Sequence, residues 1–75
     1  MLLVSTDFIT DKKLQTLGIV YGIGKGFLIK KQISSTNEEM KEEARALGGD
    51  AIINVRYQYT EDACIFGFGT AVRFM

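Results

Sequence analysis

The fold is decided by residues 44–72, which read ARALGGDAIINVRYQYTEDACIFGFGTAV. The segment opens with the end of a helix, because Gly48-Gly49 supplies the left-handed conformation at which helices commonly stop. Apolar and polar residues then alternate from Ala51 to Tyr59, which is the period of a half-buried strand. A second alternating run extends from Cys64 to Phe74. The segment therefore predicts a helix that packs on a β-hairpin.

The two alternating runs also predict a hairpin register. If Glu61-Asp62 forms a two-residue turn, the bulky side chains of both strands share one face. The resulting pairs are Tyr59 with Cys64, Tyr57 with Phe66, Val55 with Phe68, and Ile53 with Thr70. We expect this bulky face to pack on the helix and the lighter face to pack on a neighbouring molecule. Glu-Asp lacks the glycine that such turns prefer, so a longer loop would move the register.

The predicted helix starts at Ser34-Ser35-Thr36-Asn37. Ser35 with Glu38, or Thr36 with Glu39, would form a capping box, and both glutamates would then lie in the positive first turn. Apolar side chains recur at i, i+4 and i+7 and form one stripe: Met40, Ala44 and Leu47.

Two strands are predicted before the helix. Leu2 to Val4 forms a short one, and Leu17 to Ile23 alternates large and small residues. Phe27-Leu28-Ile29 and Ile33 would continue the second strand past a glycine-rich bend. The fold class is therefore α+β. We expect a β-α-β-β subunit, with one helix on a small antiparallel sheet, a short extra N-terminal strand, and residues 1–75 as a single domain.

The small size of the chain favours self-association. A domain of 75 residues buries only about 60% of its unfolded surface, so small domains rely on disulfides, a metal or oligomerisation. The single cysteine excludes an internal disulfide framework, and the absence of histidine removes the commonest metal ligand. One helix cannot cover both faces of a sheet. We therefore expect a homo-oligomer.

Composition argues against several classes of partner. Nine basic and nine acidic residues give no net charge, and nothing indicates the basic surface that nucleic-acid binding needs. No apolar run approaches the roughly 20 residues of a membrane span, and no signal-peptide core follows the N-terminus. A single cysteine without an export signal predicts a cytoplasmic protein.

With no histidine and no hydroxyl beside a recognisable base, we expect a protein that is not an enzyme.

Cys64 is the candidate metal ligand. It is the only soft ligand besides methionine sulfur, and one thiolate cannot supply the roughly three or four ligands of a metal site. A symmetric homo-oligomer could gather several copies, and covalent carriage of a soft element such as selenium is a second option. The simpler alternative is an inert core residue, because Cys64 is in phase with Phe66 and Phe68.

Two further groups carry weaker alternatives. Glu61-Asp62 and Asp50 offer oxygen ligands for a hard cation, but their spacing does not match a calcium loop, and a solvated turn is simpler. Gly22-Ile23-Gly24-Lys25-Gly26, with Lys30-Lys31, could hold an anion. It matches no phosphate-loop motif, so a tight bend or close subunit contact is the simpler interpretation.

Tyr57 and Tyr59 also allow two interpretations. Both could line a ligand pocket by stacking. On an alternating strand that faces a helix, aromatic side chains more often belong to the core.

Four fragments of the chain, taken in order, resemble one known family. They are VSTDFI at residues 4–9, LGIVYG at 17–22, ARALGGDAII at 44–53 and GTAV at 69–72. They resemble the segments ISTTD, GIVTG, A..LGADAVV and GTAV of the YbjQ-like family, which carries the label "putative heavy-metal-binding". The resemblance implies a β-α-β-β subunit similar to the dodecin subunit, assembled as a homopentameric ring. No cofactor is implied.

The chain departs from this family in one region. Typical members carry a long insertion between the first main strand and the helix, whereas Gly24 to Ser34 is short here. The family also shares no single set of metal ligands that maps onto this chain. Our leading hypothesis is a small oligomeric binding protein that binds a soft metal or metalloid through Cys64. The alternative is a structural or interaction ring with no small-molecule ligand.

Overall fold

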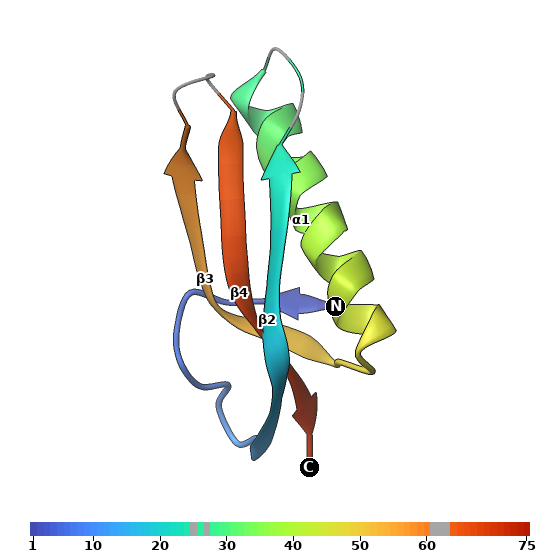
Figure 1. Ribbon diagram of the computed structural model, residues 1–75. Helices are drawn as coiled ribbons and strands as arrows, with labels where there is room; N and C mark the ends of the chain where they lie inside the picture. The colour runs from blue at the N-terminus through green and yellow to red at the C-terminus, as the bar shows by residue number, and fades with distance from the viewer. Residues whose placement is uncertain (25, 27, 61–63) are drawn as a thin grey trace.

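A computed structural model describes residues 1–24, 26, 28–60 and 64–75 as one helix against one four-stranded sheet (Figure 1). Its elements are β1 (Leu2–Leu3), β2 (Leu14–Gly24), α1 (Ile29–Ala46), β3 (Ala51–Tyr59) and β4 (Ile65–Phe74). The strand order is β1-β3-β4-β2. The predicted β-α-β-β fold with a short N-terminal strand is confirmed. The sheet is mixed rather than antiparallel throughout, because β1 pairs with β3 in parallel.

The helix begins earlier than predicted. α1 starts at Ile29 after the N-cap Leu28, which makes no side-chain capping bond. Both predicted capping boxes are therefore wrong, and the predicted extension of the strand through Ile33 is wrong too. Thr36 lies inside the helix, where its hydroxyl donates a 2.8 Å hydrogen bond to the carbonyl oxygen of Gln32. Inside a helix, a threonine hydroxyl can donate to the carbonyl oxygen four residues earlier. A threonine therefore does not by itself mark the first residue of a helix.

The buried stripe of α1 is small and partly polar. Its fully or nearly buried members recur every four residues: Gln32, Thr36, Met40 and Ala44. The predicted burial of Met40 and Ala44 is confirmed, whereas Leu47 is 48% exposed. The stripe packs on glycines. A Cβ atom added at Gly22 would lie 2.5 Å from the carbonyl oxygen of Thr36. The helix backbone can therefore approach β2 this closely only because that side chain is absent.

This glycine packing reverses the predicted orientation of the sheet. The side of β2 and β4 that carries the glycines faces α1, and the side with the bulkier residues points away from it. On β2, Val20 is fully buried, whereas its neighbour Ile19 is 77% exposed. The prediction that the bulky faces pack on the helix is wrong for β2 and β4, whereas Val55 and Tyr57 of β3 do face α1. Bulky side chains would hold the helix away from the sheet, whereas glycines allow close contact.

A bulge in β3 explains the difference in hairpin register. Asn54 has a φ of 54°, and the pairing with β4 shifts between Ile53 and Arg56. Before the bulge, Ile53 pairs with Thr70 as predicted. After the bulge, the other predicted pairs are wrong by one residue: Tyr57 pairs with Gly67, Tyr59 with Ile65, and Arg56 with Phe68. One extra residue exchanges the two sides of a strand, so the bulge turns Tyr57 toward the helix side. The predicted Glu61-Asp62 turn lies outside the described residues.

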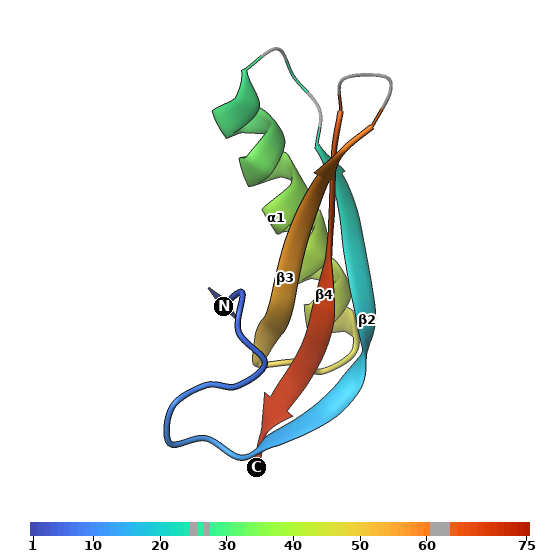
Figure 2. The ribbon, with the colours of Figure 1, turned by 90° about the vertical axis from the view of Figure 1, so that its left-hand side faces the viewer.

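The side of the sheet away from α1 is covered over part of its length. Ala51, Ile53 and Val72 form a second buried cluster, against which Val4 and Ile9 of the N-terminal segment pack. Backbone bonds hold that segment along β3, including one of 2.8 Å from the Asn54 N–H to the Thr6 carbonyl oxygen. Farther along β2 and β4, no helix or strand of the described residues covers this side (Figure 2).

Candidate functional site

The uncovered side of the sheet carries a group of apolar side chains, which we call the β2 surface. It consists of the exposed Ile19, Tyr21 and Ile23 of β2 and the half-buried Phe66 and Phe68 of β4. Ile19, Tyr21 and Ile23 are 77%, 54% and 43% exposed. The rings of Tyr21 and Phe66 stack with centroids 6.0 Å apart, and those of Phe66 and Phe68 are 5.9 Å apart. Contiguous apolar surface of this kind usually marks an interaction site.

The backbone edge of β2 is closed by two glutamates of α1. The N–H of Tyr21 donates to Oε2 of Glu43, and the N–H of Ile23 donates to Oε2 of Glu39, both at 2.8 Å. Residues four apart on a helix are separated by about 6 Å, close to the roughly 6.7 Å between alternate strand residues, so the two spacings match. β2 is an outer strand, and an open edge can recruit a foreign strand. At these two amides β2 therefore offers side chains, rather than backbone donors, to a partner.

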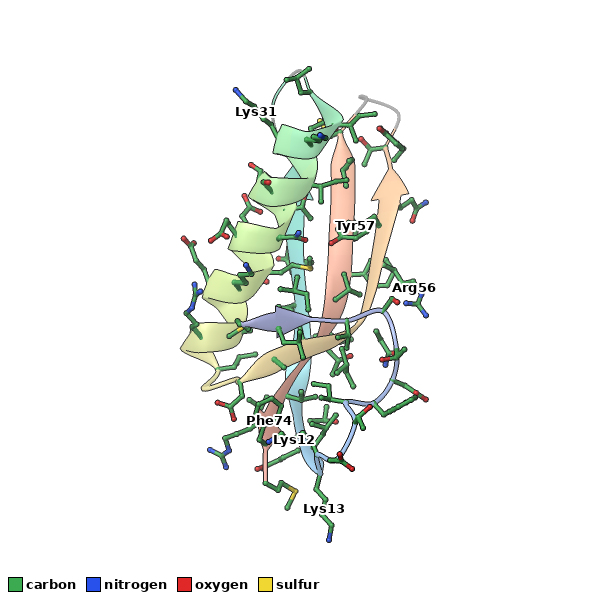
Figure 3. The ribbon with its side chains drawn as sticks, turned by 180° about the vertical axis from the view of Figure 1, so that it is seen from behind. Lys12, Lys13, Lys31, Arg56, Tyr57 and Phe74 are labelled. Atoms are coloured by element: carbon green, nitrogen blue, oxygen red, sulfur yellow. The ribbon has the colours of Figure 1, made fainter. Side chains whose placement is uncertain are left out.

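A groove of about 230 Å³ opens on the other side of the sheet, between α1 and the ends of β3 and β4. Its lining is Ile29, Ile33, Tyr57, Gln58, Tyr59 and Ile65. Tyr57 extends from β3 toward α1, where its hydroxyl donates a 2.6 Å hydrogen bond to Oδ1 of Asn37 (Figure 3). Tyr57 and Tyr59 are 45% and 56% exposed. The core interpretation of these tyrosines is therefore wrong, and the structure favours the pocket alternative.

Cys64 is half-buried at the residue before β4. Its backbone is held by Thr60, whose N–H donates to the Cys64 carbonyl oxygen at 2.9 Å and whose hydroxyl accepts the Cys64 N–H at 3.3 Å. Among the described residues, no three or more histidine, cysteine, aspartate or glutamate side chains are grouped so as to hold a metal ion. A metal bound by Cys64 would therefore need ligands from beyond this part of the chain.

The other predicted candidates are not brought together. Oδ2 of Asp50 accepts the N–H of Phe74 at 2.9 Å, which supports a structural role at the end of β4. Lys30 and Lys31 lie exposed in the first turn of α1, and Lys31 points away from the sheet (Figure 3). Lys25, Glu61 and Asp62 lie outside the described residues.

The groove at Tyr57 and Tyr59 is one of the two interpretations that the sequence allows, whereas the β2 surface is not expected from the alternating pattern. That pattern assigns the residues of β2 to two sides, but the wrong side was expected to face the helix. One signal could have corrected this choice: Gly22 and Gly24 share a side of β2, and Gly67 and Gly69 share a side of β4. Glycines at alternate positions of two neighbouring strands mark the side on which another backbone approaches closely.

These features define a small α+β domain with two exposed apolar surfaces. The chain belongs to the YbjQ family, whose model, described as "Putative heavy-metal-binding", matches residues 27–75. The resemblance drawn from the four sequence fragments is thereby confirmed. No helix in the described part of the chain is both long and apolar enough to cross a lipid bilayer.

Similar proteins support this assignment. A UPF0145 protein of Clostridium novyi (strain NT) is 34% identical, and one of Alkaliphilus metalliredigens (strain QYMF) is 36% identical. Both alignments extend over 103 residues and cover 100% of each chain. Because this chain has 75 residues, these relatives carry residues that it lacks. The crystal structure of a DUF74-family protein of unknown function from Pediococcus pentosaceus superimposes on this chain with a TM-score of 0.83 at 16% identity. It covers 100% of this chain and 98% of that one, which shows a shared fold.

Proposed function

We propose that this protein is a non-enzymatic, homo-oligomeric binding protein whose subunits form a ring, with five as the expected number. The observation that carries this proposal is the β2 surface, with Ile19 77% exposed beside stacked aromatic rings. α1 covers one side of the sheet, and the N-terminal segment covers only part of the other. Removing apolar surface from water contributes about 25 cal/mol per Å², so covering the β2 surface with another subunit stabilises the assembly.

The exposed area is large enough to form the centre of an interface. Large side chains present roughly 150–250 Å² each, so the exposed fractions of Ile19, Tyr21 and Ile23 leave on the order of 350 Å² in water. A stable interface buries about 800 Å² per partner, with an apolar core inside a polar rim. The β2 surface therefore supplies the core of such an interface and leaves the rim to surrounding polar residues.

Native mass spectrometry of protein purified without chelator or reductant tests the proposal. We expect one oligomeric species, with a mass of five chains, that persists on dilution to micromolar concentration. Sedimentation velocity in solution provides an independent measurement of the same assembly. A monomer in both experiments would contradict the proposal.

A shared soft-metal or metalloid site at Cys64 is the second candidate function. The description of the family names heavy-metal binding, and Cys64 is the only cysteine of the chain. Since the described residues hold no group of three ligands, several copies of Cys64 in a ring would have to supply them together. A metal site shared by several copies of Cys64 would make the protein a carrier or binding protein for a thiophilic ion.

Metal analysis of the wild type and the Cys64→Ser variant tests this candidate. We expect less than one cadmium ion per chain to bind in a fixed ratio to the oligomer, and the variant to lose this binding while it keeps the same oligomeric mass. Equal cadmium binding by both proteins, or none by the wild type, would contradict the role of Cys64. Absence of binding in an intact oligomer would favour a structural or interaction ring without a small ligand.

A further inference from the structure

The outer edge of β3 is covered along its first part only. The N-terminal segment pairs with this edge as far as Val55, whose N–H donates to the Val4 carbonyl oxygen at 3.0 Å. Arg56 lies where the covered part ends, and its Nη1 donates to the Ser5 carbonyl oxygen at 2.7 Å (Figure 3). The segment then turns away toward the start of β2 (Figure 2). Residues 57–59, which we call the free edge, therefore have no neighbouring strand on their outer side within the described chain.

The ladder with β4 determines which way the backbone groups of the free edge point. Thr60 faces β4, because its N–H donates to the Cys64 carbonyl oxygen at 2.9 Å. In an antiparallel pair, successive residues alternate between facing the partner strand and facing away from it. Gln58 therefore faces β4, whereas the N–H and C=O groups of Tyr57 and Tyr59 point outward. Within the described residues, these two outward N–H groups make no hydrogen bond.

The free edge lies beside the groove. Tyr57 and Tyr59 carry the outward backbone groups, and their side chains line the groove. Because α1 packs mainly over β2 and β4, these side chains stay 45% and 56% exposed. The bond between Tyr57 and Asn37 holds one ring in position before any partner arrives. Outward backbone groups next to an apolar pocket are the two elements with which proteins bind an extended peptide as an added strand.

The two outer strands of the sheet differ in how their edges are protected. At β2, two glutamate carboxylates of α1 accept outward N–H groups. The free edge of β3 has no such cover within the described residues. Proteins usually shield exposed strand edges, because an open edge pairs with other chains. Here the unshielded section is the one next to an apolar groove, as a binding site for a strand requires.

The size of the site fits a short segment better than a second folded domain. Large side chains present roughly 150–250 Å² each, so the exposed fractions of Ile29, Tyr57 and Tyr59 leave on the order of 300 Å² in water. A stable interface between folded proteins buries about 800 Å² per partner. A short extended segment needs less apolar contact, because it also gains backbone hydrogen bonds along the edge.

We infer that the free edge and the groove bind an extended peptide segment of another protein, in which every second residue is apolar. The segment pairs its backbone with Tyr57 and Tyr59 and places one large apolar side chain in the groove. A cavity of about 150 Å³ accommodates benzene, so a groove of about 230 Å³ has room for such a side chain. The groove lies on the opposite side of the sheet from the β2 surface, so the inference does not depend on the proposed ring.

NMR titration of the full chain with a synthetic peptide tests the inference. The peptide is acetyl-KTVTFTVTK-amide, in which threonine alternates with valine or phenylalanine. Before addition, the amides of Tyr57 and Tyr59 should exchange with solvent faster than that of Gln58. We expect both signals to shift on addition, and their exchange to slow about 10-fold when the free peptide is at about ten times its Kd.

Three outcomes of the titration would overturn the inference. One is slow exchange of the Tyr57 and Tyr59 amides without peptide, which would show that the edge is already paired between copies. The second is a spectrum unchanged up to millimolar peptide. The third is a set of shifts confined to the β2 surface. A monomeric wild type that binds the peptide at the free edge would remove the proposed ring and leave this inference standing.

Two N-methylated peptides test whether the backbone makes the contact. One carries methyl groups on the valine and phenylalanine nitrogens, and the other carries them on the threonine nitrogens. Alternate residues of a strand point to opposite edges, so only one of the two sets can face β3. We expect one peptide to lose binding and the other to keep it, and the set that loses binding reveals the direction of the added strand. Equal effects of the two sets would overturn the inference.

A matched pair of variants separates the backbone of Tyr59 from its side chain. Tyr59→Pro and Tyr59→Val both remove the ring, but only proline removes the outward N–H, a loss that an edge strand tolerates. One hydrogen bond contributes a factor of roughly 3 to 10, so the peptide should bind Tyr59→Pro more weakly than Tyr59→Val by that factor. Circular dichroism checks folding, and Tyr57→Pro with Tyr57→Val replaces the pair if Tyr59→Pro unfolds. Equal affinities within a folded pair would refute strand addition.

Discussion

The backbone N–H of Ile23 donates a 2.8 Å hydrogen bond to the carboxylate of Glu39, which joins the outer strand of the sheet to the helix that covers it. The same relationship is repeated two residues earlier on the strand and four residues later on the helix, between Tyr21 and Glu43. These side chains satisfy donors that a strand edge would otherwise present to solvent or to another chain. They also determine which flank of the helix lies beside β2.

Removal of both carboxylates should loosen this edge. A hydrogen bond to a charged group contributes about 1.5–3 kcal/mol, and partial exposure reduces this, so the Glu39→Ala/Glu43→Ala double variant should lose roughly 1–3 kcal/mol of unfolding free energy. Urea unfolding measures the loss. We expect light scattering to show more aggregation as well, because two edge donors become available. The control is Glu42→Ala, which removes the exposed glutamate beside Glu43. If the control and the double variant lose the same unfolding free energy, the proposed role of the Glu39 and Glu43 carboxylates is refuted.

Gly22→Ala should be strongly destabilising. The added Cβ would lie 2.5 Å from the Thr36 carbonyl oxygen and 2.9 Å from Cβ of Glu39, so the helix must move. Such overpacking costs about 1–3 kcal/mol or more. Thermal unfolding of this variant should be compared with Thr16→Ala, an exposed position of the same strand, which is expected to change stability by no more than about 0.5 kcal/mol. A Gly22→Ala protein as stable as the wild type would argue against the close helix–strand contact.

Asn54 should tolerate glycine and reject valine. Its φ of 54° lies in the left-handed region, which glycine adopts freely and a β-branched residue resists. We expect Asn54→Val to lose about 1–3 kcal/mol of unfolding free energy and Asn54→Gly to remain close to the wild type. Chemical denaturation of the three proteins checks the order. Equal losses in both variants would show that the side chain, rather than the backbone conformation of the bulge, is what matters.

The thiol of Cys64 should report on a shared metal site. It is half-buried in the isolated subunit, so a thiol reagent such as Ellman's should modify it in the native, metal-free protein. Thiolate ligands are blocked while they hold a metal ion, so one-third to one-half equivalent of cadmium per chain should suppress the reaction if several copies share each ion. Denaturation in a chelator should then restore one reactive thiol per chain. Full reactivity in the presence of excess cadmium would exclude Cys64 as a ligand.

Local pattern predicted some elements well and others poorly. The alternation from Ala51 to Tyr59 matches β3 at both ends, and Gly48-Gly49 correctly marks the end of α1. The start of α1 was mispredicted because Ser35 and Thr36 are good capping residues in isolation. In the folded chain, Thr36 and Gln32 are buried against the sheet, and this packing extends the helix back to Ile29. Tertiary contacts thus override a local capping signal.

The sequence by itself determined the kind and order of the main elements, and which residues share a side in β4 and in β2 from Gly18 onward. Alternation alone leaves open which side meets the helix, because a period of two is the same for either choice, so the tertiary structure decided it. The choice is made at Gly22, where the missing side chain lets the backbone of α1 approach β2. The bulge at Asn54, a backbone conformation that alternation does not reveal, then turns Tyr57 toward the groove. Close packing on the glycine side consequently leaves Ile19 and Tyr21 exposed on the other side of the sheet.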